Sequence, residues 1–436
     1  MNTRTSGKTI AIIGGGAAGM MAAARLAEGI KSLQEKNSTQ EIKIVLFDKN
    51  DHLGAKVIIS GGGRCNVTTG IADIKKLLEN YPRGAKFLRT AMHNFSPSKV
   101  MEWFESHSVP LKTEEDLRVF PQSDNGKDIV GALEKALAPI TKLHLRTNVT
   151  NISKRTGFII QTKKETITAD YLLIATGGSA YRQTGSTGDG YAFAQALGHT
   201  ITGLAPSLSS FITKEPYPKD LAGVSFTQTE ITLASNTSPT ETKHFTRKGP
   251  LVFTHRGVSG PAIFALSGMA AYETFSPEKP HQLSINFVPK LSHTELLNKL
   301  QEQANLHGKK EFKNFLDIFL PKSLCEVITH ILIKQKKLTS EDMHAGQMNA
   351  ELKKETAKLI QAFPLTITGR SPGEEFVTAG GVPLTEVDPN TMESKICPNL
   401  YFAGEVLDID GFTGGFNLQA SWASGYLAGE SILSQV

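Results

Sequence analysis

The sequence predicts an α/β protein in which a parallel, doubly wound sheet is formed by both ends of the chain and interrupted by a long insertion. Three observations lead to this prediction. Residues 9–48 alternate apolar strand-like runs with a helical pattern, residues 400–429 repeat a strand, a glycine turn and a helix, and the stretch between them shows other periodicities. With 436 residues, 39% hydrophobic and 20% charged, the chain can bury full cores in two or three domains.

The first element is a strand–helix–strand unit. TIAII, from Thr9, is a short apolar strand, a glycine turn and the alanine-rich helix AAGMMAAARLA follow, and KIVLFD is a second apolar strand. The polar run KSLQEKNSTQE between the helix and the second strand predicts a surface excursion. This order is typical of the βαβ opening of a doubly wound sheet.

The later elements divide the chain into domains. A strand is predicted at 171–176 and a helix from Asp189 to Leu197, and NLYFAGE predicts another strand near the C-terminus. Between them, the alternation in FTQTEITL and HQLSINFV predicts a compact antiparallel β unit, whereas LLNKL and VITHILI have helical spacing. The predicted domains are a discontinuous domain of residues 1–205 and 363–436, an inserted β subdomain of 206–290, and an inserted helical subdomain of 291–362.

Composition limits the classes of function. Three widely spaced cysteines, Cys65, Cys325 and Cys397, form neither a disulfide scaffold nor a CxxC metal site, so we predict no metal and a reducing, cytoplasmic setting. The N-terminal MNTRTSGK lacks the apolar core of a signal peptide, and no run of about 18 apolar residues predicts a membrane span.

Of the formal net charge of +5, most lies in residues 201–364, which hold 19 Lys and Arg against 15 Asp and Glu. This surplus suits a polyanionic partner, although an ordinary solvated face also explains it.

The first chemical motif is Gly14-x-Gly16-x-x-Gly19, between the first strand and the helix. Gly14 permits the tight turn, Gly16 lets the backbone approach a pyrophosphate, and Gly19 allows close helix packing. The helix N-terminus presents free N–H groups and a partial positive charge to phosphate. Asp48 ends the second strand, where a carboxylate can accept hydrogen bonds from ribose hydroxyls. Together these features predict a dinucleotide site.

A second glycine signature near the C-terminus favours FAD over NAD. A strand ends at Gly404 and Glu405, and the glycine turn from Gly414 to Asn417 opens a helix. An NAD dehydrogenase needs no such signature at the far end of the chain. A second helix N-terminus suits the edge of a flavin, where negative charge develops on reduction. A plain strand–turn–helix is the alternative.

The segment GAKVIISGGGRCNVT, from Gly54 to Thr68, contains three consecutive glycines, which are costly in backbone entropy for a casual linker. We interpret it as backbone packed against a flat ring. Arg64 could pair with a phosphate or an anionic flavin, and Asn66 could bond a ring edge. Cys65 could donate a proton, but a small buried thiol is the commoner role of such a residue.

Two further stretches predict loop sites, each with a structural alternative. In DLRVFPQSDNGKDIV, Arg118 and Asp124 line either a pocket or a solvated turn. In FTHRGVSGPAI, the Gly-Pro pair suits the start of a helix, so His255, Arg256 and Ser259 either face a ligand or serve in capping and packing.

The stretch TGSTGDGYAFAQALGH is a glycine-rich loop entering a helix, with Asp189 as a natural cap. It lacks the GK[ST] ending of a nucleotide P-loop, and the sequence contains no HExxH, CxxC or serine-centred elbow. Metal and hydrolytic chemistry are therefore not supported.

Five blocks are distinctive as a set: IIGGGAAG, ISGGGRCNVT, ATGGSAYRQTGSTGDGYAFAQALGH, FTHRGVSGPAI, and TAGGVPLTEVDPNTMESKICPNLYFAGEVLDIDGFTGGFNLQASWASG. Together they resemble the BaiN/RdsA-type family of NAD(P)/FAD-dependent oxidoreductases, a branch of the glutathione-reductase-like flavoproteins, from Ile10 to nearly the C-terminus. The resemblance implies a Rossmann-like FAD-binding domain formed by both chain ends, with an inserted β-barrel-like subdomain and a helical subdomain. Leu117 stands where the family pattern has glycine, and Ala420 where a bulkier residue is usual, which puts only the pocket shape in doubt.

The resemblance also implies which residues contact FAD, from the pyrophosphate loop through the adenine, near the backbone of Val149, to the flavin ring. The predicted cofactor-binding residues are Gly14, Gly16, Ala17, Ala18, Gly19, Asp48, Lys49, Lys56, Ser60, Gly61, Gly62, Gly63, Arg64, Cys65, Asn66, Val149, Thr176, Gly177, Gly404, Glu405, Gly415, Phe416, Asn417 and Leu418. The predicted catalytic residues are Arg64, Cys65, Asn66 and His255.

The family resemblance implies two candidate reductions: of a bile-acid enone, and of a uridine in large-subunit ribosomal RNA to dihydrouridine. Both reduce a C=C conjugated to a carbonyl, with hydride passing from flavin N5 to the β carbon and a proton to the α carbon. We favour the RNA substrate, because a basic insert suits a polyanion, with NAD(P)H as a transient reductant at the flavin face.

Other functions remain as alternatives. One is an oxidase or dehydrogenase of small amines or acids, with Arg64, Arg118 or Arg256 as a carboxylate clamp. Another is a flavin-dependent redox sensor or RNA-binding protein without turnover.

Overall fold

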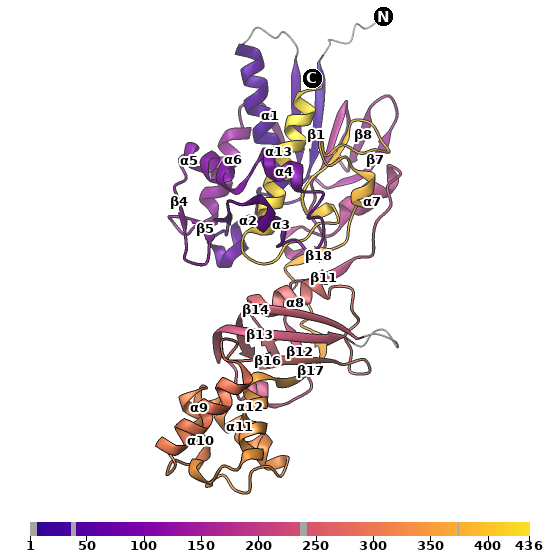
Figure 1. The fold of residues 1–436 in the computed structure, drawn as a ribbon. Helices are drawn as coiled ribbons and strands as arrows, with labels where there is room; N and C mark the ends of the chain where they lie inside the picture. Colours follow the sequence, from indigo (N-terminus) through magenta and orange to yellow (C-terminus); the bar gives the residue numbers. More distant parts are fainter. Residues whose placement is uncertain (1–6, 36–40, 236–241, 374) are drawn as a thin grey trace, which may run out of the picture. The chain divides into compact units, whose positions relative to one another are not determined.

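The structure, a computed structural model, describes residues 7–35, 41–235, 242–373 and 375–436. The predicted surface excursion at 31–41 lies partly outside these residues, as does most of the N-terminal MNTRTSGK segment. The chain forms two compact units, one of residues 1–207 with 375–436 and one of residues 208–374 (Figure 1). The chain was predicted to return to the first domain at residue 363, but it returns at 375, because strand β17 (Phe363–Arg370) belongs to the sheet of the second unit.

A five-stranded parallel sheet organises the first unit. Its order is β19 (Leu400–Phe402), β10 (Tyr171–Ile174), β1 (Lys8–Ile13), β2 (Ile42–Phe47) and β6 (Thr141–His144). The strands are apolar over most of their length because helices and loops cover both faces, as in doubly wound folds. The N-terminal strand therefore lies at the centre of a sheet whose edge is a C-terminal strand.

Two helices from opposite ends of the chain pack against one another in this unit. Helix α1 (Ala17–Glu35) and helix α13 (Phe416–Leu433) run side by side, in indigo and yellow in Figure 1. Their approach is close because small residues line the contact: a Cβ at Gly425 would overlap the carbonyl oxygen of Ala18. Helix α6 (Gly126–Leu137) packs against α1 as well.

Smaller elements complete the first unit. A three-stranded sheet has the order β7 (Val149–Lys154), β8 (Phe158–Thr162), β9 (Thr166–Ala169), and another has the order β3 (Thr68–Thr69), β5 (Arg118–Pro121), β4 (Leu111–Thr113). The remaining helices are α2 (Ala55–Ile59), α3 (Ile74–Leu78), α4 (Arg89–Asn94), α5 (Pro97–Ser106) and α7 (Asp189–Ala196). Strands β11 (Ala205–Ser207) and β18 (Val377–Ala379) pair antiparallel where the chain leaves and re-enters the unit.

The second unit contains a closed antiparallel barrel. Its order is β12 (Phe211–Thr213), β15 (Gly257–Ser259), β14 (Lys243–Thr254), β13 (Ser225–Ser235), β16 (His281–Asn286) and β17. Alternate residues of β13 and β16 are buried, which is the period-two pattern that predicted these strands. Helix α8 (Pro261–Met269) packs against β14 and has proline in its first turn, as the sequence predicted.

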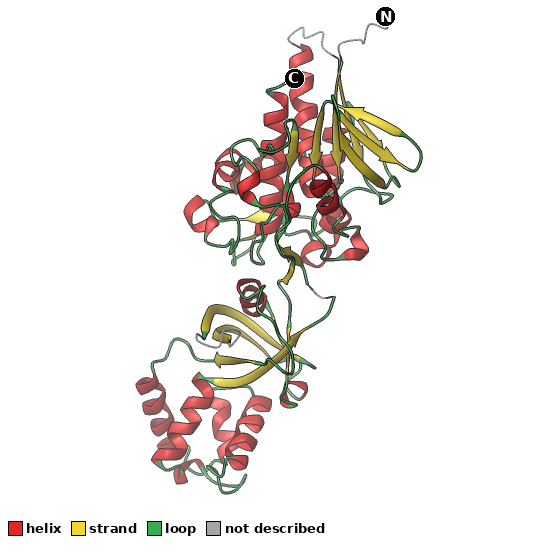
Figure 2. Ribbon diagram, turned by 90° about the vertical axis from the view of Figure 1, so that its right-hand side faces the viewer, coloured by secondary structure: helices red, strands yellow, loops and turns green. Residues whose placement is uncertain are grey.

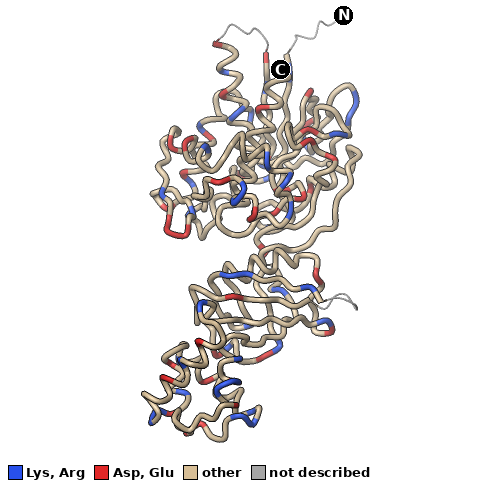
Figure 3. Tube along the Cα trace, in the orientation of Figure 1, with Lys and Arg blue, Asp and Glu red and all other residues tan. Residues whose placement is uncertain are grey.

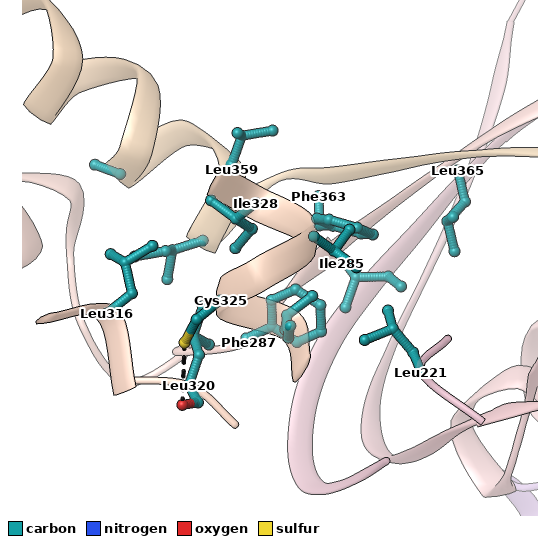
Figure 4. Close-up of a cluster of buried hydrophobic side chains, with 14 of the residues drawn as sticks. Leu221, Ile285, Phe287, Leu316, Leu320, Cys325, Ile328, Leu359, Phe363 and Leu365 are labelled. Carbon is teal, nitrogen blue, oxygen red and sulfur yellow. Dashed lines mark hydrogen bonds between the residues drawn. The ribbon is translucent and has the colours of Figure 1, made fainter. Parts of the chain in front are cut away.

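The helical part of the second unit shares its core with the barrel. It consists of α9 (His293–Leu306), α10 (Phe312–Phe315), α11 (Lys322–Lys334) and α12 (Ala350–Gln361) (Figure 2). Phe287 and Phe363 from the barrel side belong to one buried cluster with Leu316 and Ile328 from the helices (Figure 4). The predicted β and helical subdomains are therefore joined by a continuous hydrophobic core. None of the helices in the described part of the chain combines the length and apolarity that crossing a membrane requires.

Candidate cofactor-binding site

The loop between β1 and α1 contains glycines of two physical kinds. Gly14 has a φ of +107°, and a Cβ there would lie 2.5 Å from the carbonyl oxygen of Ala175. A Cβ at Gly19 would overlap the carbonyl oxygen of Gly14. A Cβ at Gly16, in contrast, would meet nothing within 4 Å among the described atoms. The first and third glycines thus permit close backbone packing, whereas the second leaves space at the N-terminus of α1, where a phosphate can approach.

Asp48 follows the end of β2 and joins this loop. Its carboxylate accepts the N–H of Gly15 at 2.7 Å and the N–H of Asn50 at 2.8 Å. Burial raises the pKa of Asp48, while these two hydrogen bonds lower it by less. Each carboxylate oxygen has a second lone pair, so the side chain can still accept hydrogen bonds from a ribose. Gly15, which sequence analysis did not single out, is also constrained, because a Cβ there would clash with Leu53.

These residues open onto a cavity of about 650 Å³ that is partly open to solvent. It is lined by seven residues of the predicted set: Gly14, Gly16, Asp48, Lys49, Lys56, Val149 and Thr176. Residues of β1, β2, α2 and β7 thus meet around one cavity, as the prediction of a cofactor site requires.

The cavity is also lined by a segment whose role the sequence did not reveal, residues 184–189. Lys49 forms an ion pair with Asp189 at 2.6 Å and a hydrogen bond with the hydroxyl of Thr187. Asn50 donates to the carbonyl oxygen of Thr184 at 3.0 Å. Asp189 was predicted to cap α7, but the N-cap is Gly188, and the Asp189 carboxylate instead holds Lys49. In the sequence, only the glycine-rich composition of this segment could have indicated that it lines the cavity.

The triple-glycine segment, residues 60–66, adopts left-handed backbone conformations. The φ angles are +57° at Gly61, +73° at Gly62 and +89° at Gly63, a region that glycine enters without steric cost. A Cβ at Gly62 or Gly63 would meet nothing within 4 Å in the described part of the chain. The backbone therefore presents an open face, as expected of a segment that receives a flat ring.

Arg64, which was predicted to bind an anion, pairs with two carboxylates of the protein; its contact with a phosphate or with the flavin stays a prediction. Its guanidinium donates to Asp124 at 2.8 Å and to Glu114 at 2.6 Å, and lies 3.9 Å from the centre of the Phe120 ring. With two carboxylates on its polar edge, Arg64 is already neutralised within the protein. Asp124 likewise pairs with Arg64 and Lys112 rather than lining the cavity.

Cys65 and Asn66 anchor the end of the segment. Cys65 is fully buried, and this burial raises the pKa of its thiol to about 12. A fully buried thiol packs within the protein, and the predicted proton transfer from Cys65 to a substrate stays a prediction. The Asn66 amide oxygen accepts the N–H of Gly415 at 2.9 Å, and its nitrogen donates to the carbonyl oxygen of Thr68 at 3.0 Å. Asn66 thus joins the segment to the turn that precedes α13.

The C-terminal signature reaches the cavity lining through a contact with Lys56. Glu405 accepts a hydrogen bond from Lys56 at 2.9 Å and from the N–H of Thr378 at 2.9 Å. Gly415 has a φ of +88°, and a Cβ there would overlap the carbonyl oxygen of Thr68. The Asn417 side chain bonds to the backbone of Gly411 through both its oxygen and its nitrogen. Asn417 therefore shapes the turn rather than offering a free amide to a ligand.

Three further predicted residues do not line the cavity. Arg118 is exposed and pairs with Asp116 and Glu114. His255 and Arg256 form the exposed turn between β14 and β15 of the second unit. Their predicted contact with a ligand stays a prediction. The described residues contain no group of three His, Cys, Asp or Glu side chains arranged to hold a metal ion.

The cavity fits FAD. A phosphate can approach Gly16, ribose hydroxyls can reach Asp48, and the adenine can reach Val149 along the cavity wall. The fold and this site define a class, that of FAD-dependent oxidoreductases built on a Rossmann-type sheet. The family described as HI0933-like protein Rossmann domain matches residues 8–431, and the chain belongs to this family. The predicted family, fold class, FAD cofactor and oxidoreductase class are thereby confirmed.

Known proteins resemble the chain along almost its whole length. It is 28% identical to the 3-dehydro-bile acid delta(4,6)-reductase of Clostridium scindens, over 97% of this chain and 98% of that protein. It is 29% identical to the ribosomal RNA dihydrouridine synthase of Escherichia coli, over 97% of each. Among solved structures, the 3-ketosteroid delta1-dehydrogenase of Sterolibacterium denitrificans shares the fold, with a TM-score of 0.51, 11% identity, and coverage of 99% of this chain and 100% of that one.

Proposed function

We propose that the protein reduces an activated C=C, and that its substrate is a uridine of large-subunit ribosomal RNA, which becomes dihydrouridine. The observation that carries the class of reaction is the end-to-end similarity to two relatives whose names describe reduction of a C=C in a steroid and in a uridine. In both substrates the double bond is conjugated to a carbonyl, which makes its β carbon an acceptor for hydride. The shared fold thus supports one reaction on two kinds of substrate.

The residues of the first unit would hold the cofactor as follows. The N-terminus of α1, at Gly16, would face the pyrophosphate, and Asp48 would accept hydrogen bonds from the ribose. The triple-glycine segment would lie along the flavin ring with its open side. FAD supplies the transfer of hydride when it is bound. The thiol of Cys65 is fully buried, so we do not assign the role of proton donor to it.

The choice of RNA over a steroid acid rests on charge. The stretch 201–364, which covers most of the second unit, holds 19 Lys and Arg against 15 Asp and Glu. Figure 3 shows Lys and Arg along the long barrel strands and over the helices of this unit, interspersed with Asp and Glu. A basic surface attracts a polyanion from a distance and gains affinity by releasing its counterions. The proposal places the protein in the cytoplasm, where ribosomal RNA is found.

NAD(P)H is the proposed electron donor, bound transiently at the flavin face. The sequence contains no second GxGxxG strand–turn–helix unit that would form a dedicated nicotinamide domain. Calorimetric detection of a tight nicotinamide site that saturates independently of the flavin would contradict this part of the proposal.

The decisive experiment is deletion of the gene, followed by mass spectrometry of modified uridines in ribosomal RNA. We expect one dihydrouridine of the large subunit to disappear and to return on complementation. An unchanged set of dihydrouridines would reject the RNA substrate.

Flavin reoxidation distinguishes the alternatives. Under nitrogen, NADPH should bleach the flavin, and RNA from the deletion strain should restore its colour. If a 3-oxo steroid with a conjugated double bond restores the colour and RNA does not, the small-molecule reductase is favoured. Reoxidation by oxygen alone would favour an oxidase, and a flavin that NADPH does not bleach would favour a protein without turnover.

A further inference from the structure

We propose that Arg64 is a positioning residue. By pairing with Glu114 and Asp124 over the ring of Phe120, it holds the triple-glycine segment in the conformation that receives the flavin ring. This inference rests on the proposed placement of that segment along the flavin. It is an alternative to the phosphate-binding or flavin-binding role that the sequence suggested for Arg64.

The guanidinium of Arg64 contacts two carboxylates along its edge and the ring of Phe120 on its face. Its Nε donates to Asp124 at 2.8 Å, and its Nη2 lies 2.6 Å from Glu114 and 2.7 Å from Asp124. The plane lies over the Phe120 ring, which is 1% exposed. A single exposed ion pair contributes little to stability, but a planar fork bound by two carboxylates and stacked on a ring has a defined orientation. Arg64 can therefore fix geometry.

The same phenylalanine supports the glycine segment. A Cβ at Gly61 would lie 3.2 Å from Cε1 of Phe120, so the Gly61 backbone already lies close to the ring that Arg64 covers. The N–H groups of Arg64 and Cys65 both donate to the carbonyl oxygen of Ser60, which closes the segment into one turn. A shift of Arg64 would thus be passed to Gly61 through Phe120 and through the turn.

The two middle glycines depend on these ends. At Gly62 and Gly63 a Cβ would meet nothing within 4 Å in the described residues, so no neighbouring side chain supports this side of their backbone. One end of the segment is anchored by buried Cys65 and by Asn66, and Arg64 with Phe120 holds the turn from the side of β5. The cavity around Gly16 and Asp48 has a separate set of contacts. Loss of Arg64 should therefore disturb the flavin ring more than the retention of FAD.

The test uses full-length holoprotein carrying Arg64→Met. We expect FAD to remain bound at full stoichiometry, with a changed visible circular dichroism band and higher flavin fluorescence. The apparent Kd for FAD should rise by no more than about tenfold, because the loop at Gly16 and Asp48 keeps its own contacts. Arg64→Lys keeps the charge but loses the fork and the stacking, so its flavin signals should lie between those of Arg64→Met and the native protein.

Lys112→Met is the matched control. Lys112 pairs with the same carboxylate, Asp124, at 2.7 Å, but among the described residues no hydrogen bond or ion pair joins it to residues 60–66. Its flavin spectra should match those of the native protein. If Arg64→Met does not fold, Asp124→Asn provides a second route, because it weakens the Arg64 pairing and leaves the arginine in place.

The outcomes separate positioning from a purely structural role. A lower Tm in Arg64→Met with unchanged flavin dichroism and fluorescence would overturn the proposal, as would equal spectral changes in Lys112→Met. The spectra require no substrate, so the test stands apart from the RNA experiment. Changed spectra together with normal ribosomal dihydrouridine after gene deletion would support Arg64 and reject the proposed substrate.

Discussion

The chain contains two GGG runs that look alike in sequence and differ in structure. In IIGGGAAG, Gly14 and Gly15 cannot accept a Cβ because neighbouring atoms lie too close, and only Gly16 faces open space. In ISGGGRCN, all three glycines have left-handed φ angles, and a Cβ at Gly62 or Gly63 would meet nothing. In the first run Gly14 combines a positive φ with close packing, whereas in the second run Gly62 and Gly63 need glycine for backbone conformation alone. Substitutions should therefore damage the two runs in different ways.

The largest effect is expected at Gly19, the closing glycine of the first motif. Gly19→Ala forces a methyl group into the carbonyl oxygen of Gly14, so the free energy of unfolding should fall by about 3 kcal/mol, with loss of FAD. Chemical denaturation measures this change. Gly131→Ala in α6 is the control: a Cβ there meets nothing within 4 Å, and it should stabilise the helix by up to about 1 kcal/mol. Equal stabilities of the two variants would refute the packing role of Gly19.

Next in size is Gly16→Val, which separates cofactor binding from folding. The side chain enters open space and should leave the apoprotein folded, but it occupies the place predicted for the pyrophosphate. We expect a folded, colourless protein by circular dichroism and absorbance. Purification of a yellow protein at full FAD stoichiometry would show that the loop has been assigned to the wrong part of the cofactor.

A smaller effect is expected at Gly62 in the second run. Gly62→Ala places a Cβ in the left-handed region, which costs about 1 kcal/mol, although no atom obstructs it. Gly62→Asn should cost less, because asparagine tolerates this conformation. Thermal denaturation of the pair tests whether conformation is what matters. An asparagine variant less stable than the alanine variant would point to a steric limit instead.

The smallest effect concerns Leu117, in the turn between β4 and β5. Leu117 has a φ of +65° and is 45% exposed, which explains why the family resemblance leads one to expect glycine there. Leu117→Gly removes the strain but adds freedom to the unfolded chain, so the net gain in unfolding free energy should be about 0.5 kcal/mol. Denaturant titration with Leu117→Ala, which keeps the strain, as the control measures it. A glycine variant less stable than the alanine variant would refute the strain.

The sequence predicted the elements whose signal is local. The β1–α1–β2 unit and the C-terminal strand and helix were visible because their periodicity and glycine turns lie within short windows. The partners of Arg64 were not, because Glu114 and Asp124 lie 50 and 60 residues further along the chain. Lys49 and Asp189 are separated by 140 residues. Such pairings depend on how the small sheets and loops meet, which no local pattern records.

The same reasoning explains the misplaced domain boundary. Residues 363–370 were assigned to the discontinuous domain, but whether they join the parallel sheet or the barrel depends on pairing with β12 and β16. Likewise, alternation predicted the barrel strands and helical spacing predicted α9 to α12 separately. Only the shared cluster around Phe287 and Phe363 shows that they form one core.

The pairing of α1 with α13 determines the order in which the two units can fold during synthesis. A chain leaves the ribosome from its N-terminus, and α1 meets its partner only after residues 416–433 have been made. Residues 208–374 are contiguous and can fold while the rest is still being synthesised. In a chain stalled before residue 400, the second unit could be folded, but the first unit would lack β19 and α13. Helix α1 would then be uncovered and one edge of the parallel sheet unpaired, which would make the chain a target for chaperones and proteases.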